Sequence, residues 1–176
     1  DISICRKCKR PSCISPKVCK NLNADHTPML ELYKEVDSIP GIKKSFIGSG
    51  VRYDLLLNRY DDNALNDSAN KYMRELIAHH VSGRLKVAPE HTSDEVLKQM
   101  SKPSFTQFGQ FKKIFDRISK EEGLNQQLIP YFISSHPGCT EADMAELAAI
   151  TKDLHFHLEQ VQDFTPTPMT LATEMY

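Results

Sequence analysis

The sequence predicts an α/β protein in which short apolar strands alternate with capped helices at intervals of roughly 30 to 45 residues. With 176 residues, 40% hydrophobic and 26% charged, the chain is long enough to form one domain with a hydrophobic core. A dense group of cysteines precedes the alternating elements. We therefore expect a cysteine-rich segment over residues 1–24 and an α/β region over residues 25–176.

The α/β region begins with a predicted helix and strand. Thr27 followed by Pro28 is typical of a helix start, and Pro40 with Gly41 ends that helix. The segment from Lys44 to Arg52 (KSFIGSGVR) then predicts a strand that runs into a glycine-rich turn.

Apolar periodicity predicts a second helix from Asn66 to His80, followed by a strand from Arg84 to Pro89 (RLKVAP). Thr92 and Glu95 have the spacing of a capping box, which predicts that a further helix starts there.

A third long helix follows, and its apolar residues recur at helical spacing until Gly123 stops it. We expect this stripe to lie in the core; it comprises Phe105, Phe108, Phe111, Phe115 and Ile118. The next predicted elements are a strand from Leu128 to Ser134 (LIPYFIS), a helix capped by Thr140 and a last strand from Leu158 to Phe164 (LEQVQDF).

Right-handed crossovers between these parallel strands allow two architectures, an open doubly wound sheet or an arc of a TIM-type barrel. Both place a binding site at the carboxyl ends of the strands. Polar residues follow each predicted strand there: Ser49, Gly50 and Arg52, then Glu90 and His91, then His136, then Asp163 and Thr165.

Each of these positions has a structural alternative. Arg52 is suited to binding an anionic group such as a carboxylate or to pairing with Asp54. Glu90 is either a functional carboxylate or part of a helix cap, and His136 either moves a proton or orients its Pro-Gly loop. Four other histidines lie on helix faces or a helix exit and are interpreted as structural: His79, His80, His155 and His157.

The first nineteen residues contain Cys5, Cys8, Cys13 and Cys19 in the pattern C-x2-C-x4-C-x5-C. Four soft ligands this close together favour a zinc ion or an iron–sulfur cluster, and the alternative is unrelated thiols or two disulfides. Basic residues among them reduce the repulsion between ionised thiols: Lys7, Lys9, Arg10, Lys17 and Lys20.

The net charge of −1 gives no overall attraction for nucleic acid, although the cysteine-rich start is locally basic. The chain has no run of 18 apolar residues and no signal-peptide pattern, so we expect no membrane association and a cytoplasmic location. In the cytoplasm clustered cysteines are more typical of metal ligands than of disulfides. The chain begins at Asp1 without a methionine, and we expect a piece of a longer protein.

Five segments together closely resemble the YgiQ-type radical SAM proteins, a bacterial group of uncertain activity. They are CKRPSCISPKVCKNLNADHTPMLELY, IPGIKKSFIGSGVRYDLLL, YMRELIAHHVSGRLKVAPEHT, LIPYFISSHPG and VQDFTPTPM. The resemblance implies a partial TIM-type (β/α) barrel that binds S-adenosylmethionine and a [4Fe-4S] cluster and generates a 5′-deoxyadenosyl radical, with an unknown substrate.

That family holds its cluster in a C-x3-C-x2-C loop, which is missing from this chain. The resemblance therefore implies that the cluster lies in a missing N-terminal part of the same protein and that this chain alone is inactive. Ser49, Gly50, Arg52 and Glu90 become candidates for contacts to S-adenosylmethionine. Glu90, His136 and Asp163 are the catalytic candidates, and the four cysteines become a separate zinc or auxiliary iron–sulfur site.

The alternative is a zinc-stabilised nucleic-acid or protein binding module without catalytic activity.

For the barrel fragment we also expect self-association, because strands with helices on one face leave their inner face and edges open. The residues expected on that inner face are Phe46, Leu85, Val87, Tyr131 and Val161.

Overall fold

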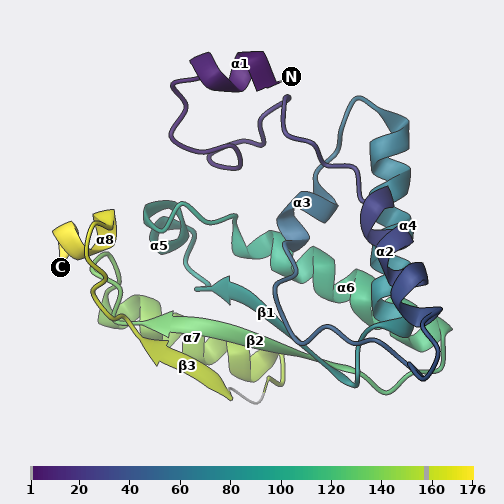
Figure 1. Ribbon diagram of the computed structural model, residues 1–176. Coiled ribbons are helices and arrows are strands. Elements are labelled where there is room, and N and C mark those ends of the chain that lie inside the picture. The colour runs from purple at the N-terminus through teal and green to yellow at the C-terminus, as the bar shows by residue number, and fades with distance from the viewer. Residues whose placement is uncertain (1, 157–158) are drawn as a thin grey trace.

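The computed structural model describes residues 2–156 and 159–176. Its strands β1 (Arg84–Glu90), β2 (Gln127–Ser134) and β3 (Gln160–Asp163) form a parallel sheet in the order β1-β2-β3 (Figure 1). The helices are α1 (Ile2–Lys7), α2 (Thr27–Asp37), α3 (Tyr53–Leu57), α4 (Asn63–His79), α5 (Asp94–Gln99), α6 (Phe105–Glu121), α7 (Glu141–Asp153) and α8 (Leu171–Met175). The predicted α/β class with a parallel sheet is confirmed. Leu158, where the last strand was predicted to begin, and His157 lie outside the described residues.

Helices α6 and α7 lie on the same face of the sheet. Leu85 and Val87 of β1 belong to the core cluster that contains Phe108 of α6. The Phe108 ring also contacts Phe156, which follows α7, at 5.7 Å between centroids. Figure 1 shows α7 behind the strands, whose other face is turned toward the viewer. The two crossover connections have the same hand, and this places both helices on one face of the sheet.

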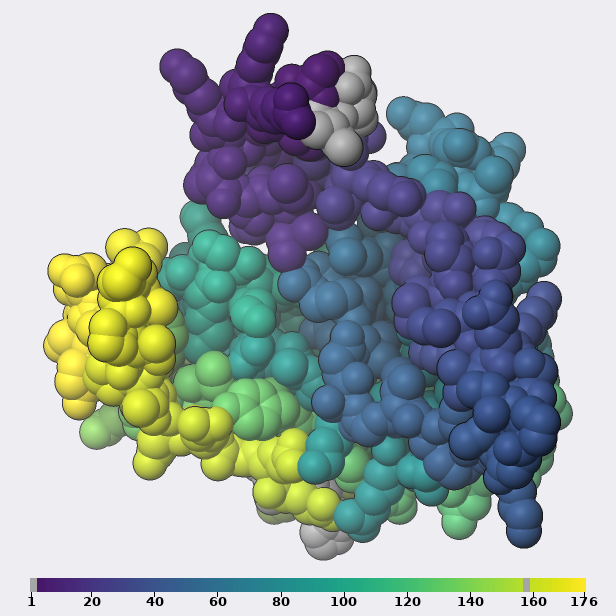
Figure 2. All heavy atoms as spheres, in the orientation of Figure 1, coloured from purple at the N-terminus to yellow at the C-terminus, as the bar shows by residue number. Residues whose placement is uncertain are grey.

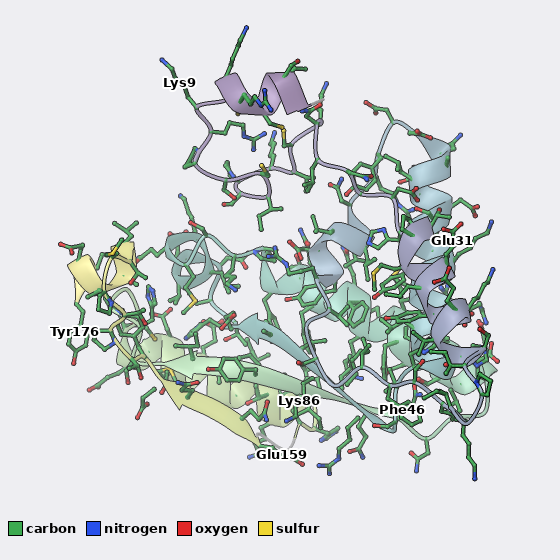
Figure 3. All side chains as sticks on the ribbon, viewed as in Figure 1. Lys9, Glu31, Phe46, Lys86, Glu159 and Tyr176 are labelled. Carbon is green, nitrogen blue, oxygen red and sulfur yellow. The ribbon has the colours of Figure 1, made fainter. Side chains whose placement is uncertain are left out.

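The opposite face of the sheet is more polar than expected. Lys86 is exposed on β1 (Figure 3), and Tyr131 donates its hydroxyl hydrogen bond to Gln162 of β3. The prediction that Leu85 and Val87 lie on the open inner face was wrong. Both side chains are buried on the face that the helices cover, with 0% and 3% of their surfaces exposed. Strand alternation explains the error, because residues on either side of Lys86 must point to the helical face.

Two other members of that predicted set also lie elsewhere. Phe46 is outside any strand, and 51% of its surface is exposed near the amino end of β1 (Figure 3). Val161 pairs with Phe132 in the parallel register, which puts its side chain on the helical side although it stays 44% exposed. Tyr131 is the member of the set that shares a face with Lys86.

The predicted strand from Lys44 to Arg52 is wrong. This segment has no ladder with another strand, and Ile47 donates a single backbone hydrogen bond to the His80 carbonyl at 2.9 Å. Two glycines interrupt it, and Gly50 has a φ of 90°, which extended strands do not use. Without a partner strand on that side of β1 among the described residues, the segment passes over the core as irregular chain.

The caps of the helices explain where they begin. Asp62 accepts from the Ala64 amide and starts α4 three residues earlier than predicted. The predicted capping box at Thr92 is wrong, because Thr92 is buried and Ser93 occupies the cap position of α5. Thr140 caps α7 as predicted, and its hydrogen bonds lower the pKa of Asp143 to about 2.

The phenylalanine stripe of α6 forms the centre of the core, as predicted. Phe108, Phe111 and Phe115 are at most 1% exposed. Tyr53 of α3 stacks on Phe111 at 5.5 Å between ring centroids, so α6 is packed between α3 and the sheet. This packing fixes the first turn of α6 beside the carboxyl end of β1.

We expect Phe108→Ala to lower the free energy of unfolding by about 3–5 kcal/mol, because it leaves a cavity in a closed core. Phe46→Ala is the matched control and should change it by less than about 1 kcal/mol, since half of the Phe46 side chain is already in water. Urea denaturation followed by circular dichroism measures both. Equal losses for the two variants would contradict the core assignment.

Candidate functional site

The carboxyl ends of β1 and β2 carry strained backbone. Glu90, the last residue of β1, has a φ of 69°, and Ser135, directly after β2, has a φ of 57°. Side chains with a β-carbon disfavour this left-handed region, and such residues persist only where the surroundings hold them. Parallel pairing brings the two ends side by side, so the strain marks one edge of the sheet.

Glu90 is the most unusual residue at this edge. Its carboxylate is nearly buried, and Oε1 accepts from Lys102 Nζ at 2.8 Å. The other oxygen, Oε2, is buried and has no hydrogen-bond partner among the described residues. An ionised oxygen without a donor is costly to bury, so the position suits a ligand that brings an ammonium or hydroxyl group.

His91 links the ends of the two strands. It is fully buried, its Nδ1 accepts from the Ser93 amide at 2.9 Å, and its Nε2 lies 3.4 Å from Cys139 Sγ. Because Nδ1 accepts, the proton of the neutral ring belongs on Nε2, which donates to the sulfur. Cys139 lies in the loop that follows β2, so this contact ties the β2 loop to β1.

The electrostatics of this pair do not favour a reactive thiolate. Burial lowers the pKa of His91, and nearby His136 lowers it further against the opposing effect of Asp143. Burial and Asp143 raise the pKa of Cys139. A neutral imidazole beside a protonated thiol is a structural contact and lacks the activation that a nucleophilic cysteine requires.

His136 and Asp163 lie at the ends of β2 and β3. His136 is buried, its Nδ1 accepts from the Gly138 amide at 3.2 Å, and burial lowers its pKa. It therefore orients the Pro-Gly loop, which was one of its two predicted roles. Asp163 is exposed and accepts a hydrogen bond from the Ser134 hydroxyl.

The glycine-rich candidates form no hydrogen bond or ion pair with Glu90 among the described residues. Ser49 and Gly50 are exposed in the irregular segment. Arg52 forms a two-pronged pair with Asp54, with Nε–Oδ1 at 2.8 Å and Nη2–Oδ2 at 2.5 Å, and Asp54 raises the pKa of the guanidinium. The ion pair is thus formed, and the remaining donors of Arg52 are available to a ligand.

Of two cavities in this part of the fold, only the smaller is lined by residues that directly follow a strand, Ser135 and His136. The larger, of about 1050 Å³, is lined by Arg52 and Lys102 and extends to the segment from Ile14 to Lys20. The smaller, of about 500 Å³, is lined by His136, Cys139 and the carboxyl-terminal residues Met175 and Tyr176. The predicted site residues that line neither of these two cavities are Ser49, Gly50, Glu90, His91 and Asp163.

The cysteine-rich segment stands apart from the sheet, above α3 and α5 (Figures 1 and 2). Its backbone brings the cysteines together in pairs: the Cys8 amide donates to the Cys5 carbonyl at 3.1 Å, and the Cys19 amide donates to the Cys13 carbonyl at 2.7 Å. Asn21 joins the pairs, because its side-chain amide donates to Cys5 Sγ at 3.1 Å and its backbone amide to Cys19 Sγ at 3.5 Å.

The four sulfurs do not converge on one point in this structure. Over residues 2–156 and 159–176, no group of three or more histidine, cysteine or acidic side chains is arranged to hold a metal ion. The cysteines are free thiols, so the two-disulfide alternative is not formed.

Sequence reasoning missed two features of the site. Lys102 gave no signal, because its role depends on the turn between α5 and α6 folding back to Glu90. Cys139 was the second, and its contact with His91 depends on the parallel register of β1 and β2. None of the helices in the described ranges is long and apolar enough to cross a membrane.

We expect acidification from pH 7 to pH 5 to destabilise the chain. The pKa values of His26, His91 and His136 are lowered in the folded state, so the unfolded chain binds more protons below its ordinary histidine pKa of about 6.5. Carboxylates such as Asp143 titrate in a lower range and contribute little here. Urea unfolding midpoints measured at the two pH values test this expectation. His91→Gln should reduce the pH dependence of the midpoint. His79→Gln is the control, because His79 lies on the exposed end of α4, and it should leave the pH dependence unchanged. A midpoint that rises on acidification would contradict the neutral state of these rings.

Comparison with known proteins gives one group of relatives. No protein-family model matches the chain. All 176 residues align, at 75% identity, with a UPF0313 protein of Bacteroides thetaiotaomicron and, at 68%, with one of Porphyromonas gingivalis, in each case over 28% of the relative's length. A UPF0313 protein of Chromobacterium violaceum is 46% identical over the same residues, which are 22% of its length.

The chain therefore spans about a quarter of the length of the curated relatives it matches. Their shared name states no activity, substrate or cofactor. Over its whole length, the chain is homologous to a segment of the UPF0313 proteins.

Proposed function

We propose that the chain is the later part of a radical SAM partial barrel and that its strand ends bind S-adenosylmethionine. The observation that carries the proposal is the buried Glu90 oxygen without a donor, at a strained strand end and next to Lys102, which lines the larger cavity. The resemblance of the sequence to the YgiQ-type radical SAM proteins supplies the chemical class. The parallel order β1-β2-β3 with helices on one face is also compatible with an arc of a TIM-type barrel.

The residues present fit parts of S-adenosylmethionine. Glu90 Oε2 would accept a hydrogen bond from the methionine amine or from a ribose hydroxyl. Arg52 would bind the methionine carboxylate with the donors that Asp54 leaves free. Ser49 and Gly50 would offer backbone contacts from the exposed irregular segment.

His136 and Asp163 would face substrate from the next two strand ends. When bound to a reduced [4Fe-4S] cluster, S-adenosylmethionine supplies a 5′-deoxyadenosyl radical that abstracts hydrogen from a substrate. The protein's contribution is orientation and exclusion of water, and the two buried histidine rings and the core beneath them give this edge a rigid base. The cluster-binding loop is not in this sequence, so we derive no step through the cluster from these residues.

We further propose that Cys5, Cys8, Cys13 and Cys19 bind one zinc ion or auxiliary iron–sulfur cluster. Three of the sulfurs already accept N–H donors, including the Arg10 amide, which lies 3.4 Å from Cys8 Sγ. Such bonds are typical of the groups that surround metal-bound sulfur. A metal would draw the two backbone-paired halves of the segment together.

The cytoplasmic location and the self-association of the isolated chain also stay predictions.

The first experiment inserts this chain into the UPF0313 protein of Bacteroides thetaiotaomicron in place of its matching segment. After anaerobic iron and sulfide reconstitution, the chimera with dithionite and S-adenosylmethionine should release 5′-deoxyadenosine, and the 176-residue chain alone should release none. Glu90→Gln should lower the rate at least tenfold by removing the ionic acceptor, a loss of about 1.4 kcal/mol in transition-state stabilisation. Glu95→Gln, an exposed position on α5, is the control. A cluster-loaded chimera without product, or product from the chain alone, would falsify the proposal.

The second experiment measures metal in the chain purified under reducing conditions. Elemental analysis should find about one zinc ion or one cluster per chain, and Cys8→Ser or Cys13→Ser should release it, because three thiolates hold a metal much more weakly than four. Cys139→Ser is the matched control and should retain the metal, since Cys139 contacts His91 and lies in another part of the fold. Metal that persists in all three variants would contradict a four-cysteine site.

A further inference from the structure

The larger cavity is a groove between the cysteine-rich segment and the α/β region. One wall is formed by residues 14–20, and the other by the chain around α3, by α5 and by the first turns of α6. Figure 2 shows the segment standing over α3 and α5 as a separate lobe. At about 1050 Å³ the groove is at the upper end of the range for small-molecule pockets, and it has room for more than one compact ligand group.

Unpaired cations line both walls of this groove. Lys17 and Lys20 come from the cysteine-rich lobe, and Arg59 and Lys98 come from the α/β region. All four are exposed, and none of the ion pairs between described residues involves them. Positive groups on two facing walls favour an anion that contacts both walls at once.

Four aspartates also line the groove, but three of them are engaged. Asp54 pairs with Arg52, and Asp62 caps α4 through the Ala64 amide. Asp94 accepts from the Ser104 hydroxyl at 2.9 Å and from the Phe105 amide at 3.1 Å. Asp61 is the fourth. Hydrogen bonds do not neutralise Asp62 and Asp94, but the six lysine and arginine residues of the lining still exceed the four aspartates by two.

The positive surface continues beyond the groove. The first 24 residues hold six lysine and arginine residues and a single acidic one, whereas the whole chain has a net charge of −1. The side chains of Arg6, Lys7, Lys9 and Arg10 are exposed, and Figure 3 shows Lys9 at the outer end of the lobe. A basic path that runs from an exposed lobe into a groove matches a linear polyanion better than a single phosphate.

The groove also contains groups that can bind bases. Gln107 Oε1 is buried without a hydrogen-bond partner among the described residues, and Gln110, one turn further along α6, is exposed and also lines the groove. A buried acceptor of this kind suits the amino group of a nucleobase. Tyr60, also on the groove wall, offers an aromatic ring on which a base can stack.

We propose that this groove binds a single-stranded nucleic acid, with phosphates on Lys17, Lys20, Arg59 and Lys98 and a base at Gln107. The inference goes beyond S-adenosylmethionine binding and does not depend on it. An unpaired strand fits because unstacked bases can enter a groove that has two walls, which a duplex cannot do without opening.

Fluorescence anisotropy of a labelled twelve-nucleotide RNA of mixed sequence tests the proposal, with the chain kept reduced and without S-adenosylmethionine. Four phosphate contacts predict a slope of about −3 for the logarithm of the binding constant against the logarithm of the salt concentration. The double variant Lys17→Ala with Lys20→Ala, and the double variant Arg59→Ala with Lys98→Ala, should each reduce the magnitude of the slope by about 1.4.

Lys120→Ala with Lys152→Ala is the control pair, because these exposed lysines lie in the last turns of α6 and α7 and do not line the groove. It should leave the slope unchanged. Gln107→Leu should weaken binding without altering the salt slope, which separates the base contact from the phosphate contacts. Thermal unfolding of each variant shows that loss of binding is not loss of fold.

Three further probes identify the ligand. DNA of the same sequence that binds within tenfold of the RNA supports a single-strand site that ignores the 2′-hydroxyl. A polyglutamate of equal charge that competes as well as RNA overturns the proposal, because it shows general polyanion binding. A duplex of matching sequence that binds more tightly than the single strand also overturns it. A slope near zero, or equal slopes for all variants, also overturns it. Failure of the radical assay leaves these results unaffected, since no cofactor is present.

Discussion

The packing of the α6 phenylalanines determines where the other elements lie. Phe108 and Phe111 contact the sheet core on one side and the Tyr53 ring of α3 on the other. Because these rings are closed off from solvent, α6 cannot shift along the sheet without opening a cavity. Its first turn is therefore fixed, and the Asp94 carboxylate joins that turn to α5. The loop between the two helices carries Lys102, whose ammonium group reaches Glu90 as a consequence.

This rigid base explains how strained residues persist at the strand ends. Glu90 and Ser135 hold left-handed backbone conformations that cost free energy in an isolated chain. The His91–Cys139 contact and the hydrogen bond from the Ser93 amide brace the first end against the loop of the second. Strain that is held by buried contacts keeps side chains in positions that relaxed loops would not maintain. These contacts thus hold Glu90 Oε2 in a buried position without a hydrogen-bond donor among the described residues.

Much of the fold could be predicted from the sequence, because β1, β2, α6 and α7 have periodic apolar patterns and local caps. The errors arise where partners decide the outcome. Residues 44–52 have strand composition, but no neighbouring strand pairs with them. Thr92 has the capping-box spacing, yet burial of its side chain moves the cap to Ser93. Glu90 and His136 were placed at the strand ends because strand boundaries are local, whereas Lys102 and the His91–Cys139 contact depend on how distant segments meet.

The cysteine-rich lobe connects the two proposals. Twenty-four residues are too few to bury a hydrophobic core of their own, and small units of this kind generally need a metal or disulfides. Ala24, where the lobe meets the body, is the one buried residue among residues 3–24. Three of the four sulfurs accept N–H hydrogen bonds, which are typical of the groups that surround metal-bound sulfur. Because the same lobe carries Lys17 and Lys20 into the groove, a bound metal would fix the wall on which the proposed nucleic-acid strand rests.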